Sequence, residues 1–458
     1  MSEPVNAFLD AHRDRFLDEL FAFLRIPSIS TDPEHKRDVD RAAAFVAESL
    51  EKAGMENVEV IRTEGHPLVY ADWLHAAGKP TVLCYGHYDV QPPDPLEEWV
   101  SPPFDPVVRD GNIYARGAAD DKGQMYTHVK AVESLRAVHG ALPVNVKFLI
   151  EGEEEVGGKA IARYVAENPV KLKADAALVS DTAMYAEGIP TLCTGLRGLV
   201  YLEVEAAGAA RDLHSGLYGG AAPNAVFGLI ELLSKAKTAD GVIRIPGTYD
   251  DVVPPAPEEK RSWESLPFSE QQFLEHEVGS ACLTGEPNFP VLERIWARPT
   301  FEVHGIAGGF TGAGAKTVIP ARATAKVSMR LVPLQDADRM IEAFRQFVKA
   351  NTPVGICTEV RVLAASPAVL VKPDHPAIRT AAKAFSDALG RPTVFIRSGG
   401  SVPIVGDLDR HLGVPTVMMG LGLPDDGLHS PNEKFKLENF YTGIRTVASF
   451  LEEYGRTA

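Results

Sequence analysis

The sequence predicts an α/β protein: a mainly parallel sheet with helices on both faces, in a chain interrupted by an inserted α+β domain. Apolar runs typical of buried strands alternate with helical segments at both ends of the chain, which favours a parallel sheet. The middle of the chain instead alternates apolar and polar residues, as strands with one solvated face do. The length of 458 residues agrees with two domains, since domains run at roughly 100–200 residues each.

Helices and buried strands alternate through the first part of the chain. Apolar residues at helical spacing predict helices over residues 5–24 and 39–53, the second ending at Gly54. Three apolar runs predict strands and the segments between them predict helices: strands over 80–90, 144–150 and 174–180, and helices over 122–138 and around 163–167. Each strand is followed at once by polar or acidic residues, and ligands of open α/β sheets gather beyond the carboxyl ends of strands.

The pattern changes after Cys193 and changes back near Pro373. Between these points the sequence predicts strands over 195–207 and 323–331, a helix over 224–236, and a Pro- and Glu-rich surface loop over 246–267. Helices and strands then alternate again as in the first part of the chain, with helices predicted over 377–389 and 437–454 and a strand over 414–419. We therefore expect one main domain from residues 1–193 and 370–458, with an inserted domain at 194–369.

Charge and cysteine content argue against several classes of protein. Lys and Arg number 46 against 62 Asp and Glu, a formal net charge of −16, whereas nucleic acids and anionic membranes attract clustered cations. Four cysteines without a CxxC pair argue against a disulfide framework. The N-terminus lacks the regions of a signal peptide, and no window approaches ~18 uninterrupted apolar residues. We expect a cytoplasmic protein that does not act at a membrane.

His87 and Asp89 follow the strand predicted over residues 80–90. A neutral imidazole is a common metal ligand, and Asp89 points to the same side of an extended chain, where it can accept the other ring N–H. The alternative is a hydrogen-bonded core histidine beside a turn aspartate.

Asp120 and Asp121 are adjacent at the start of a predicted helix, where they suit either an N-cap or a carboxylate that bridges two cations.

Four glutamates, Glu151, Glu153, Glu154 and Glu155, come directly after the strand predicted over 144–150. Their charges repel one another, so a solvated loop tip is one interpretation. A cation at the same sheet edge would offset the repulsion and leave one glutamate to act as a general base.

Asp181 follows the strand predicted over 174–180, and His429 follows the Gly427-Leu428 pair in a predicted loop. Each is a weak signal by itself. Together with the other acidic and histidine residues they offer oxygen and imidazole ligands without thiolates, which suit Zn²⁺, Mn²⁺ or Co²⁺. A carboxylate bridging two such ions suits hydrolysis by a metal-bound hydroxide. The patterns GxxxxGK[ST] and GxSxG, and GxGxxG after a strand, are absent from the sequence.

A series of motifs follows along the chain: GHYDVQPP, RGAADDKGQ, EGEEEVGG, SDTAMYAEGIPTLCTGLRG, DLHSGLYGG, GAGAKTVIP, SMRLVP, GGSVP and GLHSPNEKF. In this order, and over essentially the whole chain, they resemble the di-zinc metallopeptidase family of carnosine dipeptidases, glutamate carboxypeptidase, aminoacylase and succinyl-diaminopimelate desuccinylase. The portion from KTVIP to SMRLVP and the insertion at 246–267 most resemble the dipeptidase branch. The resemblance implies a zinc-peptidase-like catalytic domain interrupted by a lid or dimerisation domain.

The resemblance also implies a role for each site residue. His87 and Asp181 hold one metal ion, Glu155 and His429 hold the other, and Asp120 bridges both through a cis peptide to Asp121. Glu154 is the implied general base and acid, and Asp89 orients His87.

In the inserted domain, His214 resembles the residue that stabilises the oxyanion, which in dimeric members comes from the neighbouring subunit, so a homodimer is expected. Thr317, Arg330 and Ser401 match residues that hold the peptide substrate. A guanidinium pairs bidentately with a C-terminal carboxylate, which suits Arg330, although a surface salt bridge is the alternative. Residues 362–371 lack the histidine that carnosinase-like members place there, which implies a different substrate preference.

The sequence therefore predicts an enzyme that hydrolyses dipeptides or short peptides with a free C-terminal carboxylate. Two divalent ions per subunit would hold a bridging water, with Glu154 as its base. Zinc is the first expectation, and manganese and cobalt are alternatives. The competing interpretations are an N-acyl-amino-acid deacylase of the same family and a non-catalytic metal-binding protein.

Overall fold

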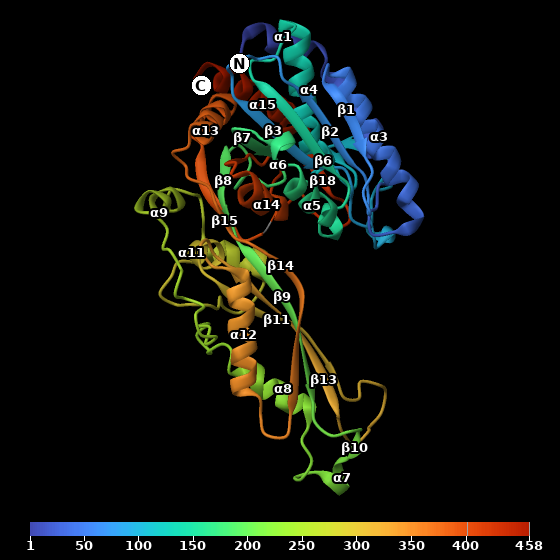
Figure 1. Ribbon diagram of the computed structural model, residues 1–458, viewed down its shortest axis with the longest axis vertical. Helices are drawn as coiled ribbons and strands as arrows, with labels where there is room; N and C mark the ends of the chain where they lie inside the picture. The colour runs from blue at the N-terminus through green and yellow to red at the C-terminus, as the bar shows by residue number, and fades with distance from the viewer. Residues whose placement is uncertain (401, 458) are drawn as a thin grey trace. The chain divides into compact units, whose positions relative to one another are not determined.

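The computed structural model describes residues 1–400 and 402–457, which form two compact units (Figure 1). The first unit contains Met1–Thr194, Val371–Ile396 and the chain from Val402 onward. The second contains Gly195–Leu370 and a short return segment that begins at Arg397. Segments from both ends of the chain therefore build one unit.

The first unit is built on a mixed α/β architecture with a parallel centre to its sheet, as the sequence predicts. The strand order is β1-β2-β6-β3-β7-β17-β8. β3 is parallel to β6 and β7, and β7 is parallel to β17, whereas β1, β2 and β8 are added antiparallel. The bounds are β1 (Glu56–Ile61), β2 (Leu68–Trp73), β3 (Thr81–His87), β6 (Asn145–Glu151), β7 (Ala176–Val179), β8 (Thr191–Leu196) and β17 (Thr416–Met418). The sequence pattern does not reveal β1 and β2.

Helices accompany this sheet and bury apolar side chains. They are α1 (Glu3–Ala11), α2 (Arg13–Leu24), α3 (Lys36–Lys52), α4 (Lys122–His139), α5 (Lys159–Glu167), α6 (Pro169–Leu172), α13 (Pro376–Leu389), α14 (Pro403–Leu412) and α15 (Leu437–Thr457). The single helix predicted over residues 5–24 is two helices, because the chain leaves helical geometry at His12, whose ring Nδ1 lies 2.8 Å from the Phe8 carbonyl oxygen. α4 packs against α15, α2 and β3, so its first turns are buried.

A small three-stranded sheet joins the last part of the chain to the first. Its order is β18 (Lys434–Lys436), β5 (Asn112–Tyr114) and β4 (Val107–Arg109), all antiparallel. This pairing holds the segment before Lys434 next to the segment that follows Tyr114.

The second unit is a four-stranded antiparallel sheet that shares an apolar core with two helices. The strand order is β11-β13-β9-β14, with bounds β9 (Gly198–Ala207), β11 (Thr300–Gly308), β13 (Arg322–Leu331) and β14 (Cys357–Ser366). Alternate residues of β9 are buried, and Val200 and Leu202 share one apolar cluster with Leu229 of α8 (Ala225–Ser234) and Phe344 of α12 (Ala337–Asn351). Short elements complete the unit: β10 (Leu213–His214), α7 (Ser215–Tyr218), α11 (Val291–Trp296), β12 (Val318–Ile319) and β15 (Val369–Leu370).

The segment 246–267 is not wholly the surface loop that its composition suggests. It contains helix α9 (Pro257–Glu264), which begins with proline at its first position and buries Trp263. Glu259 caps this helix by accepting the Ala256 backbone N–H, and its carboxylate pairs with Arg397 at 2.7 Å. Proline and glutamate thus mark a helix start here rather than an irregular loop. None of the helices in the described part of the chain is long and apolar enough to cross a membrane.

Candidate metal centre

Parallel strands deliver side chains to one edge of the sheet in the first unit. β3 ends at His87, which is in register with Glu151 at the end of β6, and Asp181 follows β7 by two residues. Gly86 precedes His87, and a Cβ at Gly86 would lie only 2.8 Å from Oδ2 of Asp121. Without a side chain at that position, Asp121 approaches closely enough to accept the His87 backbone N–H at 3.2 Å.

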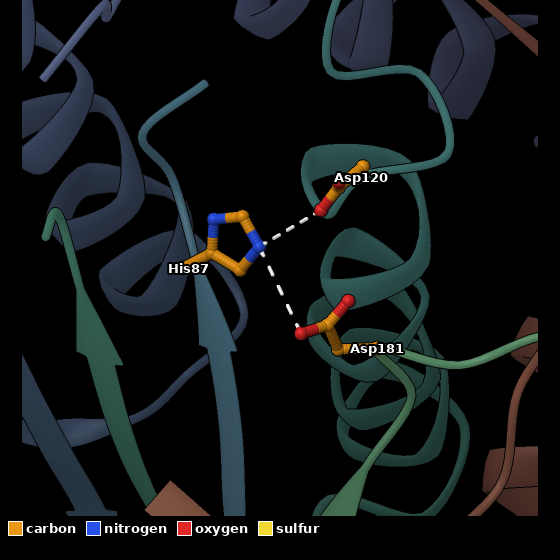
Figure 2. A group of neighbouring side chains, drawn as sticks. All are labelled: His87, Asp120 and Asp181. Carbon is orange, nitrogen blue, oxygen red and sulfur yellow. Dashed lines mark hydrogen bonds and ion pairs between the residues drawn. The ribbon is translucent and has the colours of Figure 1, made fainter. Parts of the chain in front are cut away.

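The first candidate group joins His87, Asp120 and Asp181, which Figure 2 shows pointing toward one another from three separate segments. Nε2 of His87 lies 3.1 Å from Oδ1 of Asp120 and 3.9 Å from Oδ2 of Asp181. The imidazole of His87 is fully buried. Asp120 comes from the turn before α4, where the Asp120–Asp121 peptide bond is cis.

The second candidate group joins Asp120, Glu155 and His429. Nε2 of His429 lies 2.9 Å from Oδ2 of Asp120 and 3.3 Å from Oε2 of Glu155. Gln91 donates from Nε2 to Oε2 of Glu155 at 2.7 Å. Asp120 therefore presents a different carboxylate oxygen to each histidine, and it belongs to both groups.

The donors of both groups suit a divalent cation. In each group the possible ligand atoms lie within 4.8 Å of one another, and all are imidazole nitrogens or carboxylate oxygens. Burial raises the pKa of Asp181 to about 7 and that of Glu155 to about 8, because several acidic groups crowd into a site with little water. A cation would offset this crowding of negative charge, so the residues present fit a dinuclear site.

Asp89 lies between the buried histidine and the glutamate turn. Its Oδ1 is 3.3 Å from Nδ1 of His87, which leaves Nε2 of the ring directed at the candidate group. The same carboxylate accepts the backbone N–H of Glu154 at 3.3 Å and that of Glu155 at 3.1 Å. Asp89 therefore fixes the start of the short 3₁₀ turn η3 (Glu154–Val156) relative to His87.

Glu154 begins that turn, beside Glu155. Burial raises the pKa of Glu154 above the ordinary range of a glutamate, and negative charges on Asp120 and Asp89 act in the same direction. A carboxylate with a raised pKa next to a cation site has the properties of a proton acceptor and donor.

The remaining candidate residues lie in the second unit. His214 ends β10 and is exposed, with its ring Nδ1 accepting the Gly216 backbone N–H at 3.0 Å. Thr317 is exposed just before β12, and Arg330 is half-buried near the end of β13. Burial lowers the pKa of the Arg330 guanidinium. Ser401 lies outside the described residues.

Several residues that shape the centre belong to motifs in the sequence but receive no role there. Gln91 is the glutamine of GHYDVQPP, Arg116 and Gln124 open and close RGAADDKGQ, and Glu433 is the glutamate of GLHSPNEKF. Gln124 ties two segments together, since its Nε2 donates to the Ala119 carbonyl and its Oε1 accepts the Leu421 N–H, at 2.8 and 2.7 Å. The only signal for these residues in the sequence is their presence within the motifs.

Comparison with known proteins gives consistent matches over most or nearly all of the chain. The family profile described as peptidase family M20/M25/M40 matches residues 83–453. The Cys-Gly metallodipeptidase of Candida albicans is 31% identical over 99% of this chain and 97% of that protein. The human Beta-Ala-His dipeptidase is 30% identical over 98% of this chain and 92% of that protein.

Solved structures agree with these matches. Human carnosine dipeptidase 1 superposes with a TM-score of 0.82 at 30% identity, covering 99% of this chain and 98% of that chain. An M20 family metallo-carboxypeptidase from Sulfolobus solfataricus gives a TM-score of 0.85 at 31% identity, covering 96% of this chain and 99% of that chain.

Proposed function

Because the chain belongs to peptidase family M20/M25/M40 and is a metallopeptidase, we propose that it hydrolyses the peptide bond of dipeptides or short peptides with a free C-terminal carboxylate. One observation carries the proposal: the two oxygens of Asp120 face two different imidazoles, His87 and His429, so one carboxylate is shared by two candidate metal groups. A shared carboxylate is the arrangement expected of two ions that act together on one substrate.

His87, Asp181 and Oδ1 of Asp120 would hold one ion, and Glu155, His429 and Oδ2 of Asp120 would hold the other. Imidazole and carboxylate ligands suit zinc first, and manganese and cobalt as alternatives. When bound, such ions polarise a carbonyl oxygen and lower the pKa of water toward about 7.

Glu154 is proposed as the group that takes the proton from the attacking water and returns it to the leaving amine. Its position supports this role, because Glu154 begins η3 directly beside the candidate ligand Glu155, and burial raises its pKa in the direction that helps a base also act as an acid. Nδ1 of His87 lies 3.1 Å from the Asp89 backbone carbonyl oxygen and 3.3 Å from its carboxylate, and a proton held on Nδ1 by these acceptors would leave Nε2 free for the ion.

The second unit is proposed to complete the site with His214 on the oxyanion and with Thr317, Arg330 and Ser401 on the substrate. A guanidinium fork matches a carboxylate, which supports Arg330 as the partner of the substrate's C-terminus. We also propose a homodimer formed through this unit, with His214 supplied across subunits. Large exposed apolar side chains on the second unit support it, namely Leu217, Phe227 and Ile306.

The test couples metal content to a substrate panel. Metal-free full-length protein would be reloaded separately with Zn²⁺, Mn²⁺ and Co²⁺ and offered Cys-Gly, β-Ala-His, their C-terminal amides and N-acetyl amino acids. Hydrolysis of a dipeptide with two bound ions, and weaker hydrolysis of its amide, is the expected result. Preference for the N-acetyl amino acids would instead show a deacylase, and turnover of none would overturn the proposed function.

A further inference from the structure

Glu433 is fully buried, and its carboxylate collects four N–H donors from the turn that carries Asp120. Oε2 accepts from Nη1 of Arg116 at 2.9 Å and from the Gly117 backbone N–H at 2.8 Å. Oε1 accepts from the backbone N–H groups of Ala119 at 2.9 Å and of Asp120 itself at 3.1 Å.

These four bonds suit a carboxylate, which accepts on both oxygens. A carboxylate offers acceptor sites on two oxygens and no donor, so each oxygen of Glu433 can take two N–H groups at once. The Arg116 guanidinium supplies the balancing charge inside the protein. A glutamine would place an amide N–H₂ against two of these donors, so it would break half of the arrangement while keeping the side chain's size.

The same residue also anchors the loop that carries His429. The Glu433 carbonyl accepts the Ala115 backbone N–H at 3.2 Å, and β18 begins at the next residue. Asn432 adds a second anchor, since its Oδ1 accepts the Val100 backbone N–H and its Nδ2 donates to the Glu98 carbonyl, both at 2.8 Å. The position of His429 therefore depends on a loop whose far end is held by residues 432 and 433.

The two candidate metal groups depend on Glu433 to different extents. In the second group, Asp120 and His429 both belong to segments that Glu433 holds, and only Glu155 does not. In the first group only Asp120 belongs to such a segment, because His87 ends β3 and Asp181 follows β7, and the ladders of the central sheet set the positions of both strands.

From these contacts we propose that Glu433 is a positioning residue that sets the affinity of the second ion, the one assigned to Asp120, Glu155 and His429, by holding Asp120 and the His429 loop in one arrangement. The proposal rests on the metal-ligand set of the proposed function. It assigns no contact between Glu433 and the ion or the substrate.

The test counts ions rather than turnover. Metal-free full-length protein is titrated with Mn²⁺ and the free ion is measured by electron paramagnetic resonance, for the wild type, Glu433→Gln and Glu259→Gln. The control, Glu259→Gln, removes a carboxylate that pairs with buried Arg397 in the second unit. We expect two ions in the wild type and in the control. In Glu433→Gln we expect the ion of the second group to be weakened about 10–100-fold and the ion of the first group to be weakened less, since only Asp120 of that group belongs to a segment that Glu433 holds.

Equal weakening of both ions in Glu433→Gln, or no weakening, would overturn the proposal. A wild type that binds fewer than two ions would overturn the ligand set itself, and the inference with it. If Glu433→Gln loses its native circular dichroism, Arg116→Lys provides the same test, because it keeps the charge but not the guanidinium geometry that fixes Oε2. In Arg116→Lys we expect the ion of the second group to be weakened more than the ion of the first, by a smaller factor than in Glu433→Gln. Equal loss of affinity for both ions would contradict the proposal.

Discussion

Oδ2 of Asp120 lies 2.9 Å from Nε2 of His429, although the two residues come from opposite ends of the chain. The contact exists because the last part of the chain returns to the first unit and pairs β18 with β5, next to the turn that carries Asp120. Loss of the Asp120 side chain should therefore affect both candidate metal groups, whereas loss of the His429 side chain should affect only the second.

Asp120→Ala should weaken both ions, because Asp120 is the one residue that the two groups share. Asp181→Ala should weaken only the ion of the first group. Metal analysis after dialysis checks this, with a loss above about 100-fold in affinity expected for both ions in Asp120→Ala, more than an outer partner typically contributes. Retention of one ion at wild-type affinity in Asp120→Ala would show that the carboxylate is not shared.

Glu154→Gln should keep both ions and lose about 10²–10⁴-fold in kcat, the usual contribution of a general base. Glu155→Gln should instead lose the ion of the second group, since Glu155 lies 3.3 Å from His429. The two variants differ by one position in the same turn, which makes them matched controls. The opposite pattern of metal loss would mean that the roles of the two glutamates are exchanged.

His214→Ala should lower kcat by about 10²–10³-fold, as removal of one oxyanion donor does, with the metal content unchanged. His214 belongs to the second unit, whereas the candidate ligands belong to the first. His304→Ala is a suitable control, because His304 is another histidine of that unit whose ring is bonded to Ser328. Near-wild-type turnover of His214→Ala would remove it from the catalytic set.

The burial of His128 should make the folded protein less stable in acid. It is fully buried in α4, with Nε2 at 2.8 Å from the Ser180 hydroxyl oxygen, and burial lowers its pKa to about 3. The unfolded chain takes up the proton below about pH 6.5 and the folded chain does not. The free energy of unfolding therefore decreases as pH falls from about 6.5 to about 3. At pH 5 this one group costs about 2 kcal/mol.

The comparison that isolates His128 is its replacement by glutamine, whose amide can still bond to Ser180 without titrating. Urea unfolding of metal-free protein at pH 7.5 and pH 5 would be measured for both proteins. Contacts that depend on Glu and Asp titrate equally in the wild type and in the variant. The difference in the free energy of unfolding between the two proteins should therefore shift by about 2 kcal/mol in favour of His128→Gln between pH 7.5 and pH 5. A difference that stays constant with pH would contradict the neutral, buried histidine.

Hydrophobic periodicity predicts much of the fold because burial repeats along a strand or helix. The strand predicted over 144–150 is β6 at Asn145–Glu151, and the helix predicted over 122–138 is α4 at Lys122–His139. The pattern fails where a local contact decides the outcome. The helix predicted over residues 5–24 is interrupted at His12, whose ring lies next to the Phe8 carbonyl. Helix α9, capped by Glu259, lies in a segment that has the composition of a loop.

Imidazoles and carboxylates at the ends of predicted strands are visible as residue types, so the candidate ligands could be named from the sequence. The contacts that hold these side chains in place are visible in the folded chain and not in the sequence. Three of the four groups that Glu433 binds are backbone N–H groups, which every residue but proline carries, so no residue type marks them in advance. Their meeting with Glu433 depends on the return of the chain through β18, which pairs with β5 and joins segments that are far apart in the sequence.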